Sequence, residues 1–142
     1  MLRAMLPGQR RPRVLMAVSE GAAERMCRIL GGLELERPVA MPQFVDALRC
    51  SSFDLVVVGS HFDGCRAIDA IKIARTHAAD VPLACVRAAP FCTPLGDATL
   101  AAFRSAAEEL GADCFVDVLQ FPDNAEGDAR VRGMLERLVC VT

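Results

Sequence analysis

Short, nearly continuous apolar runs alternate along the chain with segments of helical periodicity. The runs at 13–18, 54–59, 83–86 and 114–118 are typical of strands that are buried on both faces of a parallel sheet. A weaker run at 35–41 contains Pro38, which is tolerated mainly on edge strands. Apolar residues recurring at helical spacing after these runs predict five helices, at 20–30, 43–50, 65–77, 98–110 and 125–138.

Five alternating strand and helix units predict the fold class. They favour an α/β, three-layer, doubly wound sheet of five parallel strands. With an edge-like second strand and a fully apolar third strand, the flavodoxin-like order 2-1-3-4-5 fits best. We expect residues 1–12 to form a flexible basic N-terminal arm and residues 13–142 to form one domain.

Composition narrows the class of protein. Hydrophobic residues make up 53% of the chain, charged residues make up 24%, and the net charge is −2, as in a soluble globular protein without a broad basic field. We therefore expect no nucleic-acid or membrane partner. No apolar stretch has the length of a signal peptide or a membrane span, so we expect a cytoplasmic protein.

The cysteines predict neither disulfides nor a metal site. There are seven of them, none of the pairs has C-x-x-C spacing, and no secretory signal precedes them. We interpret Cys85 and Cys114 as small core residues, and we expect no metal and no cofactor.

Several short motifs, in their order and spacing, carry a resemblance to a known family. They are Asp54-Leu55-Val56-Val57-Val58, the later Asp63-Gly64, Val81-Pro82-Leu83-Ala84-Cys85-Val86 and Gly111-Ala112-Asp113-Cys114-Phe115. Over residues 13–138 the chain resembles the receiver domains of two-component response regulators. The resemblance implies a signalling module with the fold predicted above.

The positions that perform phosphorylation in such receivers are replaced here. A receiver uses an aspartate after the third strand as phosphate acceptor, acidic residues after the first strand for Mg²⁺, a Ser/Thr after the fourth strand and a Lys after the fifth. The corresponding positions are Gly59 for the acceptor, Val18 and Ser19 with only Glu20 nearby for the acidic pair, Arg87 for the Ser/Thr and Val118 for the Lys. The resemblance thus implies a degenerate receiver that cannot form an aspartyl phosphate. Asp63 is a substitute acceptor without a cation site or Lys, and we do not favour it.

A new set of polar residues follows the strands at the carboxyl edge, where such folds bind ligands. It consists of His61, Asp63, Arg87 and Asp117. The simplest interpretation is a structural network in which Arg87 pairs with Asp63 or Asp117. Alternatives are a small-anion site on Arg87 and His61, a set of plain solvated residues, and a divalent-metal site on His61, Asp63 and Asp117 with no recognised ligand spacing.

Two cofactor-binding classes share this topology and fit less well. The segment 59–64 partly resembles the histidine loop of cobalamin-binding domains, but Gly59 replaces the required Asp and the loop follows the third strand instead of the first. A flavin site is disfavoured because the chain has no Trp or Tyr to stack on the ring and Ser19-Glu20-Gly21 is a poor phosphate loop.

The sequence favours a non-enzymatic signalling module that acts through protein–protein contact. A kinase or regulator, or a second copy in a homodimer, would be the partner. Phe91, in a long loop at 88–96, and Phe115, where receivers often carry a switching aromatic residue, are candidate contact residues. The alternative is a small-ligand or anion sensor that uses the rewritten pocket at the carboxyl edge of the sheet.

Overall fold

The computed structural model of the chain describes residues 11–90 and 96–140. Its centre is a five-stranded parallel sheet in the order β2-β1-β3-β4-β5, as the sequence predicts. The strands are β1 (Arg13–Ala17), β2 (Glu34–Glu36), β3 (Leu55–Gly59), β4 (Leu83–Arg87) and β5 (Cys114–Asp117). All five residues of β3 are buried, which explains why its sequence is apolar without alternation.

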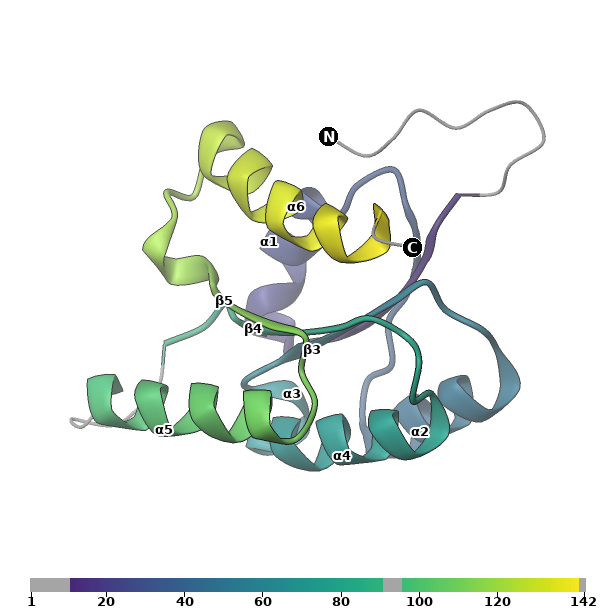
Figure 1. Cartoon of the computed structure of the whole chain (residues 1–142). Coiled ribbons are helices and arrows are strands. Elements are labelled where there is room, and N and C mark those ends of the chain that lie inside the picture. The colour runs from purple at the N-terminus through teal and green to yellow at the C-terminus, as the bar shows by residue number, and fades with distance from the viewer. Residues whose placement is uncertain (1–10, 91–95, 141–142) are drawn as a thin grey trace.

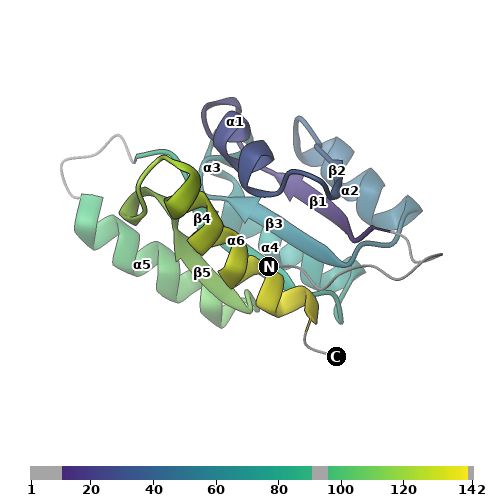
Figure 2. The ribbon, with the colours of Figure 1, turned by 90° about the horizontal axis from the view of Figure 1, so that it is seen from above.

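Helices cover both faces of the sheet and complete the three layers. In Figure 1, α1 (Glu20–Ile29) and α6 (Ala125–Cys140) lie on one face, and the other helices lie on the opposite face. Those are α2 (Met41–Cys50), the short α3 (Phe62–Cys65), α4 (Ala67–His77) and α5 (Gly96–Glu109). The view from above, in Figure 2, shows α6 lying across the sheet while α5 flanks β5 on the other side.

Two apolar clusters, one on each side of the sheet, form the core. Alternate residues of β1 divide between them, since Leu15 packs with Phe44 and Ile71 whereas Met16 packs with Met26 and Leu135. This division follows from the period of two along a strand. The helical faces predicted from the sequence are therefore the faces that are buried.

Several element boundaries differ from the sequence prediction. The second strand is Glu34–Glu36 instead of 35–41, and Pro38 lies beyond it, where its side chain is buried. The strand stops early because Pro has no N–H to donate to a neighbour. The following helix starts at Met41 instead of 43, and β5 ends at Asp117, so that Val118 begins a 3₁₀ helix, η1 (Val118–Gln120).

Some predicted features fall wholly or largely outside the described residues. The arm at 1–12 is described only from residue 11, and Phe91 in the loop at 88–96 is not described. Within the described part, no helix is both long enough and apolar enough to cross a membrane.

Of the two cysteines predicted to lie in the core, Cys85 is in β4 and Cys114 is in the edge strand β5. Cys85 is fully buried, and this burial raises the pKa of its thiol to about 12, with a smaller contribution from Cys114. Cys114 is only partly buried, and its pKa rises to about 11, mainly through burial and then through the nearby Asp113 and Glu108. Both thiols are therefore protonated and unreactive at neutral pH.

Candidate functional site

Gly59, which the family resemblance predicts at the position of the phosphate acceptor, ends the central strand β3 at the carboxyl edge of the sheet. A Cβ atom added to it would lie 3.1 Å from Cγ1 of Val18 and 3.3 Å from its Cα. Val18 is itself buried. The residues at 59 and 18 are thus coupled by packing, because Val18 occupies space that a larger residue at 59 would need.

Arg87 and Asp117 form an ion pair at the ends of β4 and β5, where they are register partners. Nε of Arg87 donates to Oδ1 of Asp117 at 3.0 Å, and each side chain is only 13% exposed. Asp117 also accepts from the backbone N–H of Leu119 at 3.3 Å. The sequence suggested Asp63 or Asp117 as the partner of Arg87, and the structure pairs Arg87 with Asp117. Through its bond to Leu119, Asp117 also stabilises the first turn of η1.

Val118, which the family resemblance predicts at the position of the receiver Lys, is fully buried and has no polar side chain. Its carbonyl accepts a hydrogen bond from Nη1 of Arg25 at 3.2 Å. The same guanidinium donates to the carbonyls of Phe121 at 3.0 Å and Pro122 at 2.7 Å, and to Asp128 at 3.1 Å. One arginine of α1 thus binds the whole segment that follows β5.

A second arginine of α1 extends this network. Arg28 donates to Asp128 and to Asp123, which lie at and just before the start of α6. The guanidinium of Arg28, and then that of Arg25, holds the pKa of the Asp128 carboxyl below its ordinary value. The sequence analysis missed this network, because contacts between α1 and α6 join residues about a hundred positions apart and leave no local pattern.

Asp63 lies in a stretch of left-handed backbone in α3, with φ of 47° at Asp63, 67° at Gly64 and 66° at Cys65. This conformation turns the carboxylate toward α2, where Oδ2 accepts from the backbone N–H of Met41 at 3.0 Å. Arg66 lies 3.6 Å from the same oxygen. Asp63 therefore stabilises the N-terminus of α2, where a negative charge is favourable.

His61 and Asp63 line a cavity of about 390 Å³ at the carboxyl edge, but Arg87 and Asp117 do not. Its other lining residues come from the segments after β1, β2 and β3, and they are Val18, Ser19, Glu20, Arg37, Pro38, Val39 and Gly64. Nδ1 of His61 is 2.8 Å from the Ser60 hydroxyl. The predicted four-residue set is thus divided between a cavity and an ion pair. Among the described residues, no group of three or more His, Cys, Asp or Glu could hold a metal ion.

Phe115, on β5, packs into the core with only 7% of its surface exposed. Its ring meets that of Phe103 edge to face, with centroids 5.7 Å apart, and the Arg104 guanidinium lies 5.8 Å from its centroid. The described contacts of its ring with aromatic and cationic groups are therefore with residues of α5.

At the opposite, amino edge of the sheet, two aspartates each accept a hydrogen bond from the first backbone N–H of a neighbouring strand. Asp54 precedes β3 and accepts from the backbone N–H of Arg13 in the neighbouring β1 at 2.8 Å. Asp113 precedes β5 and accepts from the N–H of Leu83 in the neighbouring β4, also at 2.8 Å. Each carboxylate thus satisfies the leading N–H of an adjacent strand, which gives a physical reason for both aspartates in the receiver-like motifs.

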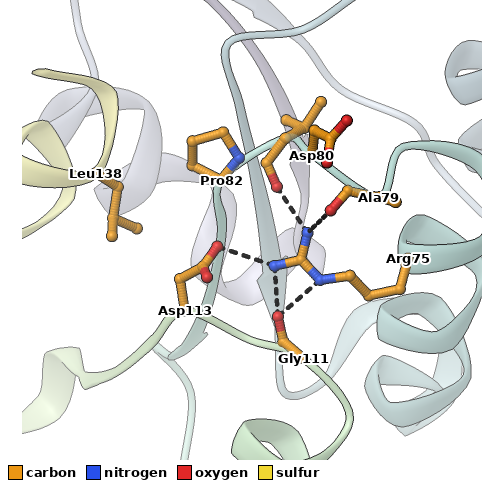
Figure 3. Close-up of a pocket in the computed structure, with 8 residues that line it drawn as sticks. Arg75, Ala79, Asp80, Pro82, Gly111, Asp113 and Leu138 are labelled. Atoms are coloured by element: carbon orange, nitrogen blue, oxygen red, sulfur yellow. Dashed lines mark hydrogen bonds and ion pairs between the residues drawn. The ribbon is translucent and has the colours of Figure 1, made fainter. Parts of the chain in front are cut away.

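Arg75, in the last turn of α4, also binds backbone at the amino edge (Figure 3). Its guanidinium donates to the carbonyls of Gly111 at 2.7 Å, Val81 at 2.8 Å and Ala79 at 3.2 Å, and to Asp113 at 2.9 Å. These bonds tie α4, the turn before β4 and the turn before β5 together. The cavity drawn in Figure 3 is lined by groups with this structural role.

Solved structures of known proteins share the fold described above. No protein-family model matches the chain, and no curated protein matches its sequence. A response regulator from Thermotoga maritima aligns over 91% of this chain and 98% of its own, with 15% identity and a TM-score of 0.68. The non-phosphorylated receiver domain of HemR from Leptospira biflexa aligns over 93% and 97%, with 24% identity and a TM-score of 0.62.

A third solved structure contains a phosphorylated aspartic acid. It is a response regulator from Burkholderia pseudomallei with a phosphorylated aspartic acid and a calcium ion, and it aligns over 87% of this chain and 72% of its own, with 15% identity and a TM-score of 0.60. The chain therefore has the CheY-like fold of response-regulator receiver domains.

Proposed function

We propose that this chain is a cytoplasmic, non-enzymatic signalling module that acts through protein–protein contact without aspartyl phosphorylation. Support for signalling comes from the receiver fold, which extends over nearly the whole chain in the solved structures that resemble it. Support for the loss of phosphorylation comes from the carboxyl edge, where an aspartate acceptor, an acidic pair and a Lys are all replaced.

Gly59 is the observation that carries the proposal. A glycine has no nucleophile, and an aspartate there would have its Cβ 3.1 Å from Val18. The two predicted carboxylates of this edge, Asp63 and Asp117, have structural partners. Asp63 binds the first N–H of α2, and Asp117 binds Arg87.

The direct test is incubation with acetyl phosphate and Mg²⁺, followed by intact-protein mass spectrometry. A receiver with an intact aspartate serves as positive control under the same conditions. We expect the control to gain the mass of a phosphoryl group and this protein to gain none. Incorporation that is lost in Asp63→Asn would overturn the proposal. The asparagine oxygen can still accept from Met41, so this variant separates loss of a nucleophile from loss of the fold.

The partner in this proposal is a kinase, a regulator or a second copy of the chain. Light scattering coupled to gel filtration tests the last of these, because a homodimer doubles the measured mass. A monomer at all accessible concentrations would exclude the homodimer and leave a different protein as the partner.

Ligand sensing is a second candidate function, and the cavity beside Gly59 favours it. An anion site built on Arg87 is not supported, because Arg87 is bound to Asp117 and does not line that cavity. The arginine that lines the cavity is Arg37, which the sequence alone did not indicate.

A further inference from the structure

The cavity at the carboxyl edge lies at the topological switch point of the sheet. In the order β2-β1-β3-β4-β5, the chain reverses its direction of winding between β1 and β3. Ligands in open α/β sheets bind in the crevice outside the carboxyl ends of the strands at this point. The cavity is lined by residues that follow β1, β2 and β3, and its volume of about 390 Å³ falls within the range of small-molecule sites.

Three polar side chains in this cavity have no partner among the described residues. Ser19 is the N-cap residue of α1, yet its hydroxyl makes no capping hydrogen bond. Glu20 and Arg37 carry opposite charges and line the same cavity, but no hydrogen bond or ion pair joins them to each other or to other described residues. In contrast, Asp63 in the same wall is bound to Met41 and Arg66.

The rest of the wall is apolar and is built on a constrained backbone. Val18, Pro38 and Val39 contribute to it, and Val39 is 73% exposed, the most exposed large hydrophobic residue in the described part of the chain. The left-handed backbone of Asp63 and Gly64 lines one side. Non-glycine residues in this conformation are costly, and such residues concentrate at binding sites.

We propose that this cavity binds a small zwitterion of the α-amino acid class with an apolar side chain. Arg37 and the Ser19 hydroxyl bind the carboxylate, Glu20 binds the ammonium group, and the side chain lies against Pro38 and Val39. A simple anion leaves Glu20 unpaired and a simple cation leaves Arg37 unpaired, whereas a zwitterion satisfies both. This inference rests on the second candidate function and names its ligand class.

The first experiment is a titration of the ¹⁵N-labelled protein with seven apolar amino acids, followed by NMR. The probes are L-alanine, L-valine, L-leucine, L-isoleucine, L-methionine, L-phenylalanine and L-proline. We expect saturable shifts for at least one probe, at amide signals of residues 18–20, 37–39 and 61–64. Absence of saturable shifts with all seven probes would overturn the proposal.

The second experiment removes one charge from the ligand at a time. For L-valine the matched probes are 3-methylbutanoate, which lacks the ammonium group, and 2-methylpropylamine, which lacks the carboxylate; the best binder is treated in the same way. We expect each analogue to bind at least about tenfold more weakly, because each loses a charge-assisted hydrogen bond. Equal binding of the carboxylate analogue would show a plain anion site and would contradict the proposal.

The third experiment removes the complementary charges from the protein. Arg37→Gln and Glu20→Gln should each weaken binding of the amino acid at least about tenfold. The matched controls are Arg49→Gln, another exposed arginine without a described partner, at the amino edge, and Glu24→Gln, one turn along α1 and outside the cavity. Unchanged affinity in the cavity variants, or equal losses in the controls, would overturn the assignment. Phosphorylation does not enter these measurements, so failure here leaves the non-phosphorylatable module standing.

Discussion

The two edges of the sheet use their charged residues in different ways. At the amino edge, Asp54, Asp113 and Arg75 all bind backbone groups of neighbouring strands and turns. At the carboxyl edge, Arg87 and Asp117 bind each other, while Glu20 and Arg37 line a cavity unpaired among the described residues.

This difference gives a physical reason why a receiver fold would persist if, as proposed, the receiver chemistry is lost. The amino-edge residues close the ends of the strands, so their loss would leave buried backbone groups unsatisfied. At the carboxyl edge, the charged residues Glu20, Arg37, Arg87 and Asp117 lie outside the two core clusters, so the packing of the core does not fix their identity. The receiver-like motifs of this sequence are accordingly concentrated in strands and amino-edge turns.

Removal of the central amino-edge arginine should have the largest effect. Arg75→Leu leaves the carbonyls of Gly111 and Val81 without their donor and should lower the free energy of unfolding by about 3 kcal/mol. Urea unfolding followed by circular dichroism measures this, since the chain has no Trp or Tyr for fluorescence. Arg49→Leu is the matched control and should change stability by less than about 0.5 kcal/mol. Similar values for the two variants would remove the distinction between bound and solvated arginines.

Restoration of the acceptor at the carboxyl edge should fail for a steric reason. Gly59→Asp places a carboxylate in a buried position against Val18 and should cost about 2 kcal/mol of unfolding free energy. Gly133→Asp is the control, because a Cβ added at that glycine of α6 meets nothing within 4 Å. A Gly59→Asp variant as stable as the control would show that Val18 moves aside at little cost in free energy. Position 59 would then lack only the carboxylate, and not the space for it.

The network between α1 and α6 should make stability depend on pH. Arg28 and Arg25 lower the pKa of Asp128 in the folded protein, so its ionised form stabilises the fold above the unfolded pKa of about 3.9. This stabilisation is lost as the pH falls through the folded pKa. Asp128→Asn should be less stable at pH 7, by about 2 kcal/mol, and should lose less stability than the wild type between about pH 4 and pH 2. Parallel unfolding curves across that range would contradict the role given to Asp128.

The ion pair of β4 and β5 should contribute modestly. A double-mutant cycle with Arg87→Gln and Asp117→Asn should give a coupling energy of about 1 kcal/mol, since both side chains retain some contact with water. Thermal or urea unfolding of the four proteins measures it. A coupling energy near zero would place Arg87 and Asp117 with the solvated residues of the carboxyl edge.

The left-handed segment beside the cavity should respond in the opposite direction. Cys65→Gly removes the cost of a side chain at φ of 66° and should raise the unfolding free energy by about 0.5 kcal/mol. Cys50→Gly, at the end of α2, should lower it by up to about 1 kcal/mol, since glycine disfavours helix. If both variants are destabilised alike, the backbone at Cys65 carries no strain.

Local patterns in the sequence predicted much of this protein because they depend on near neighbours. Continuous apolar runs predicted the buried strands, and helical spacing predicted which helical faces pack on them. The contrast between an edge-like second strand and an apolar third strand predicted the strand order. The lack of a nucleophilic side chain at position 59 can likewise be read from the sequence alone. The second strand was predicted too long, because nothing local showed that the chain leaves the sheet before Pro38.

Tertiary structure alone decided how the charged residues are paired. Asp63 follows β3 and Arg87 ends β4, yet one caps α2 and the other binds Asp117, because side-chain direction depends on the left-handed turn after β3 and on the register of β4 with β5. The guanidinium of Arg25 reaches carbonyls more than ninety positions away. Arg37 lines the cavity and directly follows the end of β2 at Glu36. An edge of a parallel sheet collects residues from distant loops, so its chemistry is set by three-dimensional contacts that no short sequence pattern records.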